Sequence, residues 1–162
     1  MFGEVYVDEG PNANGEVCFY SSGTTDLIID QSAELEPSAM SFDTTRLVDT
    51  RASGNTLPDN GSISVAAGLP NQTIIGQLTV DREKGSGFAT IYPCDKSLPT
   101  ASNVNYAADR PRSSSIIAST DAIGKDCIYV NKATDVIFDK VATAQWASHA
   151  PVRMLDTRTI PQ

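Results

Sequence analysis

The chain has 162 residues, of which 40% are hydrophobic and 20% are charged, a composition typical of a globular domain and not of a disordered chain. Its formal net charge of -8 at pH 7 argues against nucleic acid and anionic lipid as partners, because like charges repel. No apolar run reaches the ~18 residues that span a bilayer, so we expect no membrane insertion. The first residues lack the basic start and apolar stretch of a signal peptide, which leaves either a cytosolic protein or a piece of a longer exported chain.

Short segments rich in Val, Ile, Thr, Tyr and Phe, bounded by Gly, Pro, Asn or Asp, predict strands along the middle of the chain. In Ile74–Val80 the apolar and polar residues roughly alternate after the first pair, which is typical of a strand with one wet face. No window has a convincing helical period, and Ala142–Ala150 comes nearest to one. We therefore predict an all-β fold, an antiparallel β-sandwich, with a small β-barrel as the alternative. The predicted strands are Ser62–Ala66, Thr73–Val80, Gly87–Tyr92, Ser113–Thr120, Cys127–Val130 and Asp135–Asp139.

The chain repeats itself. Residues 15–30, GEVCFYSSGTTDLIID, align without gaps with residues 124–139, GKDCIYVNKATDVIFD, at an offset of 109 and with seven of sixteen positions identical. RLVDTR at 46–51 recurs as RMLDTR at 153–158, at an offset of 107. This order indicates a tandem array cut out of phase with its repeat boundaries. We expect the end of a preceding repeat in 1–37, one complete β unit in 42–146, and the first strand of a following repeat in 147–162.

Five motifs in a fixed order carry a resemblance to a known family. The motifs are RLVDTR at 46–51, LTV at 78–80, GFATIYPC at 87–94, ASNVNY at 101–106 and GKDCIYVNKATDVIFD at 124–139. In this order they resemble the long tandem repeat of actinobacterial secreted and cell-wall proteins. The resemblance implies export, a tandem architecture and a place on or near the cell wall, where such repeats serve as stalks or binding modules beside peptidoglycan-acting or protease domains. The chain departs from the pattern in Lys140–Trp146, which replaces a closing aromatic stretch, and in the polar stretch Ala52–Gly61.

The repeat also predicts a pairing for the cysteines. Cys18 and Cys127 are equivalent positions in two copies, so we expect Cys94 and Cys127 to be bridged within the complete unit. The equivalent partner of Cys18 would lie in the preceding copy. A Cys94–Cys127 bridge would stabilise the unit by about 3–4 kcal/mol on the chain-entropy model and would require an oxidising compartment. The alternatives are two buried free thiols or a metal site, but no CxxC or nearby His supplies metal-ligand spacing.

The motif Arg-x-x-Asp-Thr-Arg is the sharpest polar feature and occurs twice. Arginine offers a planar fork of donors, so these residues can bind a carboxylate or a sugar, or form a structural ion pair that fixes the first strand. We favour the structural interpretation. On a regular strand Asp49 and Arg51 would share one face while Arg46 lay on the other. The residues of the two copies are Arg46, Asp49 and Arg51, and Arg153, Asp156 and Arg158.

A second candidate surface follows the loop that begins at Cys94. Exposed Asn and Tyr are common on sugar-binding surfaces, and alternation would place Asn103 and Asn105 on one side of a short strand with Tyr106 on the other. The alternative, which we favour, is a short edge strand with capped turns. Oxygen ligands for Ca²⁺ could come from Thr134, Asp135 and Asp139, and from Thr25, Asp26 and Asp30 in the other copy. These residues more often cap turns, and no DxDxDG run is present, so we expect neither a metal nor another cofactor.

Catalytic motifs are absent from the sequence. His149 is the only histidine, and its equivalent in the other copy is Phe42, which argues against a shared catalytic base. There is no GxSxG, HExxH or P-loop pattern, and the only Glu of the complete unit, Glu83, sits in a turn-like segment, so we expect no enzyme. The leading function is an extracellular structural or adhesive repeat module. A carbohydrate- or cell-wall-binding module and an accessory domain of a peptidoglycan hydrolase are the alternatives.

The expected partners follow from the incomplete copies. A partial unit cannot bury its own apolar face, so Phe2–Asp30 and Arg153–Arg158 should pack on the complete unit or exchange strands with another chain. We therefore expect contacts with neighbouring repeats or with copies of the chain, arranged head-to-tail, and possible contact with cell-wall glycan.

Overall fold

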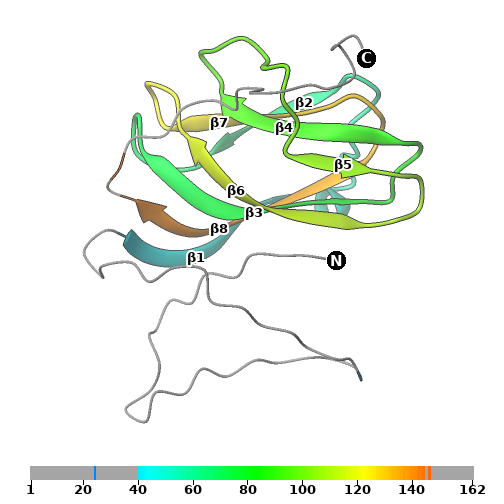
Figure 1. Cartoon of the computed structure of the whole chain (residues 1–162), viewed down its shortest axis with the longest axis horizontal. Helices are drawn as coiled ribbons and strands as arrows, with labels where there is room; N and C mark the ends of the chain where they lie inside the picture. The colour runs from blue at the N-terminus through cyan, green and yellow to red at the C-terminus, as the bar shows by residue number, and fades with distance from the viewer. Residues whose placement is uncertain (1–23, 25–39, 145, 147–162) are drawn as a thin grey trace, which may run out of the picture.

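The structure, a computed structural model, describes residues 24, 40–144 and 146. Residues 40–144 form eight strands and one short helix in two packed layers (Figure 1). The elements are β1 (Met40–Asp49), α1 (Thr50–Ser53), β2 (Ser62–Ala66), β3 (Thr73–Asp81), β4 (Gly87–Pro93), β5 (Val104–Tyr106), β6 (Arg112–Ser119), β7 (Lys125–Val130) and β8 (Asp135–Ala144). One four-stranded sheet has the order β1-β8-β3-β6 and the other β2-β7-β4-β5. The predicted antiparallel β-sandwich is confirmed.

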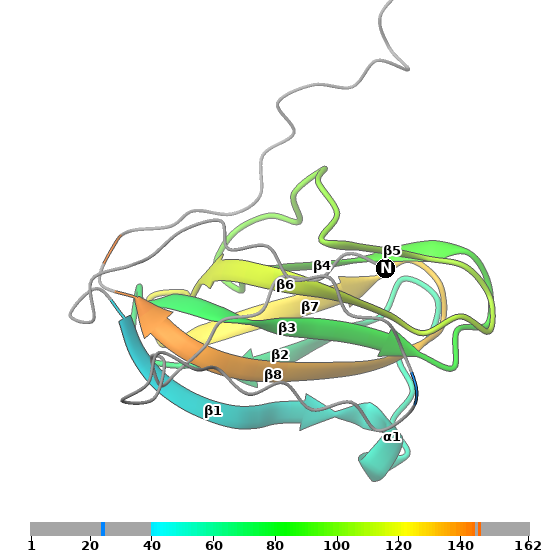
Figure 2. The same ribbon diagram turned by 60° about the horizontal axis from the view of Figure 1, so that its bottom comes forward.

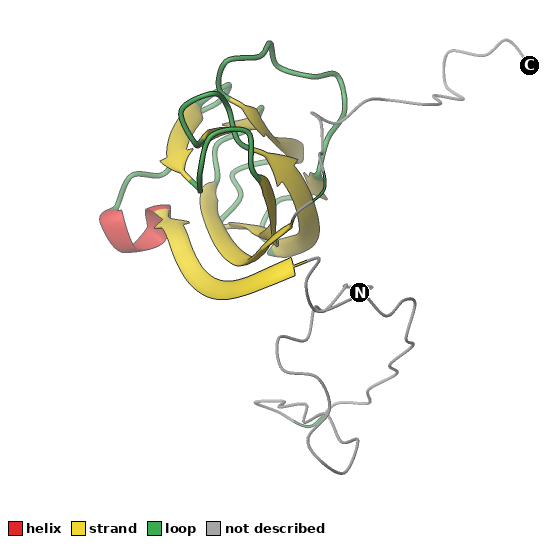
Figure 3. Cartoon of the chain, turned by 90° about the vertical axis from the view of Figure 1, so that its left-hand side faces the viewer, coloured by secondary structure: helices red, strands yellow, loops and turns green. Residues whose placement is uncertain are grey.

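The strands pair as one long hairpin folded over on itself. β1 pairs with β8, β2 with β7, β3 with β6 and β4 with β5, all antiparallel. Pairing of β3 with β8 and of β4 with β7 then joins these four ladders into two sheets. In Figure 1 the β2-β7-β4-β5 sheet lies above the β1-β8-β3-β6 sheet, and in Figure 2 the β1-β8-β3-β6 sheet has turned to the front of the other sheet. Figure 3 shows β1 curving along one side of the sandwich. This nested order is that of a jelly roll, in which the first and last strands lie side by side.

Alternating side chains from both sheets fill the space between them. In β3, Ile74, Leu78 and Val80 are fully buried in the main core, while Gln77 between them is exposed. The predicted wet face is found only around Gln77 and Thr79, because Thr73 and Ile75 on the same face of β3 are buried. Ile75 is buried in a second, smaller cluster. The other members of that cluster are Met40, Ala142 and Ala144, with Phe42 packed against them.

The last strand is longer than the sequence predicted. β8 continues past Asp139 to Ala144, because it is the only described strand that pairs along its length with both β1 and β3. A register shift in the β3–β8 ladder falls between Ile75 and Gly76. A side chain at Gly76 would meet the carbonyl oxygen of Asp139 and the ring of Phe138. Glycine is needed there because the two backbones approach closely at the irregularity.

The predicted disulfide is confirmed. Cys94 and Cys127 are bonded, with their Cα atoms 4.9 Å apart. Cys94 directly follows β4 and Cys127 lies in β7, where its register partner on β4 is Tyr92. The bridge thus fastens the end of β4 to the neighbouring strand, and the alternatives of two free thiols or a metal site at these cysteines are wrong.

The two ends of the sandwich are formed by different loops and strand ends. The end that we call the terminal end holds the start of β1, the end of β8, the loops 67–72 and 120–124, and the beginning of the β4–β5 connection. The end that we call the far end holds α1 and the loops 82–86, 107–111 and 131–134. In Figure 1 the terminal end is at the left, where the blunt start of β1 and the arrowhead of β8 lie together.

Candidate functional site

The Arg-x-x-Asp-Thr-Arg motif lies at the far end, where β1 passes into α1. Asp49 ends the strand in an extended conformation and caps the helix, because its carboxylate accepts the backbone N–H of Arg51 at 3.1 Å. Arg51 is therefore in a helical turn and not on the strand. The expectation that Arg46 faces away from Asp49 is wrong, since Arg46 Nη1 lies 3.3 Å from Asp49 Oδ2. The strand alternation fails there because the β1–β8 register shifts between Arg46 and Val48.

The guanidinium of Arg51 connects two strand ends. Its Nε and Nη2 donate to the two carboxylate oxygens of Asp49 at 3.0 and 2.9 Å, and its Nη1 donates to Asp81 at the end of β3 at 2.9 Å. The hydrogen bonds from Arg51 lower the pKa of Asp49 to about 2. The hydrogen bonds that Arg51 donates to Asp49, and then the one to Asp81, raise the pKa of Arg51 above its usual value. All three guanidinium nitrogens already have carboxylate partners, so Arg51 stabilises the β1–β3 corner of the sheet.

Arg46 makes a similar clamp between the two adjacent strands β1 and β8. Its Nε and Nη2 donate to the two carboxylate oxygens of Asp139 at 2.8 and 3.1 Å. This bidentate pair raises the pKa of Arg46 above its usual value. Asp139 is one of the residues that could have contributed to a Ca²⁺ site, and here its carboxylate is occupied by an arginine.

A buried cluster of hydroxyls surrounds Asp135 beneath the motif. Thr50 Oγ1 donates to Asp135 at 2.8 Å and accepts the backbone N–H of Val136 at 2.9 Å. Thr56 donates to the same carboxylate oxygen of Asp135 at 3.0 Å. Thr134 donates to the backbone carbonyl of Asp81, the last residue of β3. The threonine of the motif therefore fastens α1 to the start of β8.

These contacts bear on the suggested Ca²⁺ site. In the described part of the chain, Thr134, Asp135 and Asp139 are hydrogen-bonded to protein groups, and no group of three or more His, Cys, Asp or Glu is placed to hold a metal ion. The other candidates lie outside the described residues. These are Thr25, Asp26 and Asp30, the second motif copy Arg153, Asp156 and Arg158, and His149.

Asn105 is exposed between buried Val104 and Tyr106, as the predicted alternation requires, but the burial of Tyr106 removes it from the proposed glycan surface. β5 is the edge strand of its sheet, and Tyr106 is buried in the core, with its hydroxyl donating to the carbonyl oxygen of Lys132 at 2.7 Å. The Asn103 side chain accepts the backbone N–H of Ile91 at 2.9 Å. Asn105 is exposed and accepts a hydrogen bond from Ser102. Of the three residues, Asn105 alone presents its side chain to solvent.

The sequence did not predict the burial of two carboxyl groups, those of Asp126 and Glu83. Asp126, in β7, is fully buried and neither carboxyl oxygen has a hydrogen-bond partner in the structure. Burial, and to a smaller extent the charge of Asp121, raises the pKa of Asp126 to about 7. Glu83 lies between β3 and β4, in the segment predicted to be turn-like, and it is buried with both carboxyl oxygens unpartnered. The repeat contains a signal for Asp126: the preceding copy has Val17 at that position, which indicates an apolar environment.

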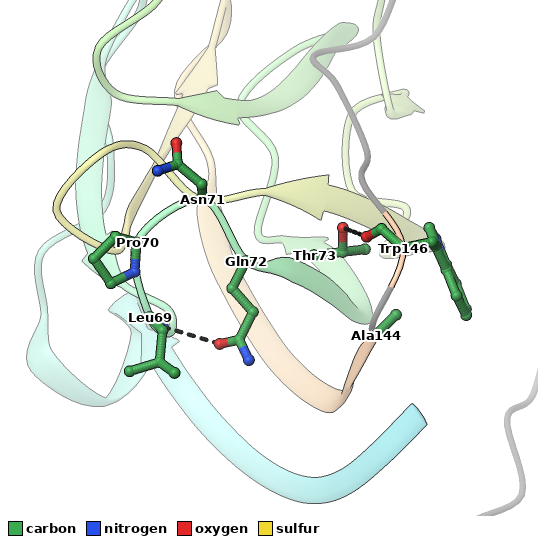
Figure 4. A pocket seen from close by; sticks show the side chains of 7 residues that line it. All are labelled: Leu69, Pro70, Asn71, Gln72, Thr73, Ala144 and Trp146. Carbon is green, nitrogen blue, oxygen red and sulfur yellow. Dashed lines mark hydrogen bonds between the residues drawn. The ribbon is translucent and has the colours of Figure 1, made fainter. Parts of the chain in front are cut away.

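The terminal end carries exposed apolar side chains and a pocket of about 360 Å³. The pocket lies between the β2–β3 loop and the end of β8 (Figure 4). Gln72 accepts the backbone N–H of Leu69 at 2.9 Å, and Thr73 donates to the backbone carbonyl of Trp146. The lining residues are Leu69, Pro70, Asn71, Gln72, Thr73, Ala144 and Trp146. The indole of Trp146 lies at the opposite side of this pocket from Leu69.

Comparison with known proteins gave no match. No family model, no curated protein and no solved structure matches the chain. Among the described residues, no helix is long and apolar enough to cross a membrane.

Proposed function

We propose that the chain is part of an extracellular tandem array in which each β-sandwich is a structural or adhesive module. One observation carries this proposal: one period of the repeated sequence coincides with one folded body. The copy at residues 124–139 falls on the end of the β6–β7 loop, β7 and the first half of β8, and RLVDTR falls on the junction of β1 and α1. An offset of 107 to 109 therefore supplies each strand of the sandwich once.

The disulfide supports a location outside the cell. Cys94–Cys127 bridges of this structural kind persist in oxidising compartments and are rare in the cytosol. Export and a place at the cell surface or in the cell wall, as implied by the resemblance to actinobacterial repeats, are part of the proposal.

The polar motif supports a structural role over a catalytic or sugar-binding one. Arg46 and Arg51 direct their guanidinium nitrogens at carboxylates of the same unit, and Thr50 is buried beneath them. Each of these residues holds β1 to another strand of its sheet. Recurrence of the motif at 153–158 then follows, because every unit of the array needs the same junction.

Cell-surface labelling of the source organism, combined with thiol mapping, tests the proposal. Antibodies against the chain should label intact cells, and the Cys94 and Cys127 peptides of the natural protein should be isolated still linked after free thiols are alkylated. Labelling only after lysis, with both cysteines alkylated, would contradict an extracellular module.

A pull-down with insoluble peptidoglycan separates the structural module from the glycan-binding alternative. We expect no retention above that of a carrier protein. Retention that is lost in Asn105→Ala, with Lys84→Ala at an exposed position of the far end as control, would replace the structural proposal with cell-wall binding.

A further inference from the structure

The chain enters and leaves the unit at the same end. Met40, the first residue of β1, is the register partner of Ala144, the last residue of β8. Both residues are at the terminal end, and the helix α1 and the charged Arg51 network are at the other (Figure 2). Any further unit of an array must therefore be joined to this unit at its terminal end.

The sequence allows little distance between successive units. By the offset of 109, Leu35 of the preceding copy is equivalent to Ala144, the last residue of β8. Residues 36–39 therefore separate Leu35 from Met40, the first residue of the complete unit. By the offset of 107, Ala147 of the following copy is equivalent to Met40, so residues 145–146 separate it from Ala144. A residue spans at most about 3.6 Å, so these tethers hold the equivalent positions within about 18 Å and 11 Å.

The exposed apolar side chains collect at this end. Among the described residues five large hydrophobic side chains are exposed, and four of them belong to the terminal end or to the adjoining part of β6. They are Leu69 (68% exposed), Ile117 (47%), Ile123 (71%) and Trp146 (36%). The fifth, Leu98, is in the β4–β5 connection, which leaves β4 at the same end and then returns along β4 of the β2-β7-β4-β5 sheet, where the Thr90 hydroxyl donates to the carbonyl of Ala101.

Hydrogen bonds hold the loops of Leu69 and Ile123 and the backbone of Trp146 beside one another, and Ile117 lies in β6, the strand that leads into the loop of Ile123. The β2–β3 and β6–β7 loops are joined by the bond from Asn71 N–H to the carbonyl of Asp121 and by the bond from the Thr120 hydroxyl to the carbonyl of Leu69. Trp146 is fixed beside them through its carbonyl, which accepts from Thr73. We call Leu69, Ile117, Ile123 and Trp146 the terminal apolar surface.

We propose that successive units of the array bind each other through their terminal apolar surfaces, terminal end to terminal end. This inference rests on the proposed tandem array. It replaces the head-to-tail order expected from the sequence, because a head-to-tail contact would bring the far end of one unit to a junction where neither chain end emerges. The charged far ends then point outward into solvent.

Short tethers make such a contact favourable. Two surfaces joined by a few residues meet at a high effective concentration, so a modest apolar contact suffices to hold them. Burying exposed Leu and Ile side chains supplies the free energy without a charged partner. Leu69 and Ile123 are exposed, so they contribute little to the core of a single unit. The proposed contact between units gives these two side chains a role.

The 162-residue chain itself provides a test, because it contains one complete terminal apolar surface. We expect sedimentation velocity to show reversible self-association, and acrylamide quenching of Trp146, the only tryptophan, to weaken as the chain concentration rises. The double variant Leu69→Ser/Ile123→Ser should raise the dissociation constant at least about tenfold. Leu98→Ser is the matched control and should leave the dissociation constant unchanged, and far-ultraviolet circular dichroism should be the same for all three proteins.

Three results would overturn the inference. Self-association that persists unchanged in Leu69→Ser/Ile123→Ser would place the contact elsewhere. A monomer with Trp146 open to acrylamide at every concentration would mean that the surface stays uncovered. A monomer with Trp146 protected at every concentration would mean that flanking segments of the same chain cover it. Any of these results would leave the surface labelling and thiol mapping of the proposed function unaffected, so the two proposals fail separately.

Discussion

Met40 and Ala144 lie opposite each other at the open end of the β1–β8 ladder. The first and last strands of the unit are thus hydrogen-bonded neighbours, as the nested jelly-roll pairing requires. An array of such units gains little length from each sandwich, because the chain returns to where it entered. The proposed array would therefore carry its modules along short connecting segments.

Tension on the two ends of the chain should peel β1 from β8. The inter-strand hydrogen bonds of an antiparallel pair run perpendicular to the strands, so a force that separates the paired ends loads them one at a time. We expect unfolding at low force in single-molecule stretching. The disulfide should then limit the length that is released, because the segment between Cys94 and Cys127, a sequence separation of 33 residues, cannot extend while the bond is intact. Reductant should add about 110 Å to the released length; an equal length with and without reductant would contradict the prediction.

The Arg51–Asp49 pair should make stability depend on pH in the acid range. Its hydrogen bonds lower the pKa of Asp49 to about 2 in the folded state, below the ordinary value of 3.8. A lowered pKa contributes stability that is complete above about pH 4 and is lost as the pH falls through about 2. We expect Arg51→Ala to lower the melting temperature at pH 6, and the difference from the wild type to shrink between pH 4 and pH 2. Arg110→Ala at an exposed far-end position is the control, and a pH-independent difference would contradict the assignment.

Thr50 should contribute more to stability than Thr56, although both bind Asp135. Thr50 is buried and its hydroxyl also accepts the backbone N–H of Val136, so Thr50→Val leaves two buried polar groups without that partner. We expect a loss of about 1–3 kcal/mol in the free energy of unfolding. Thr56→Val, at an exposed position, should cost less than about 1 kcal/mol. Urea unfolding of the two variants measures the difference, and equal losses would show that burial of the Thr50 hydroxyl is unimportant.

Asp126 should destabilise the unit at neutral and alkaline pH. Its carboxyl ionises near 3.8 in the unfolded chain and near 7 in the folded one. Between these values the unfolded state has released a proton that the folded state still holds, so the free energy of unfolding falls as the pH rises from about 4 to about 7. We expect Asp126→Val, the residue type that the preceding copy has at Val17, to raise that free energy by about 2–4 kcal/mol at pH 8.

Two further variants check the origin of this effect. Asp126→Asn keeps the shape of the side chain and should also abolish the fall between pH 4 and pH 7. Asp95→Asn removes an exposed carboxylate and should leave the pH profile of the wild type in place. A profile that survives Asp126→Asn would assign the titration to another group.

The sequence by itself determined the strands, the sandwich and the disulfide. Alternation in Ile74–Val80 reflects contact with one core face, and such a period of two depends only on neighbouring residues. The repeat placed Cys18 and Cys127 in equivalent positions and so predicted the bridge to Cys94. These signals are local, or are copied along the chain, and can be found without knowing which strands are neighbours.

Only the tertiary structure decided the order of the strands and what surrounds each side chain. Backbone pairing between β1 and β8, which brings Met40 opposite Ala144, has no residue-specific signal, so the jelly-roll order and the shared terminal end could not be predicted from the sequence. The register shift that turns Arg46 toward Asp49, and the burial of Tyr106, likewise depend on partners far along the chain. Long-range pairing sets these features because each needs a second strand to define its inner and outer face.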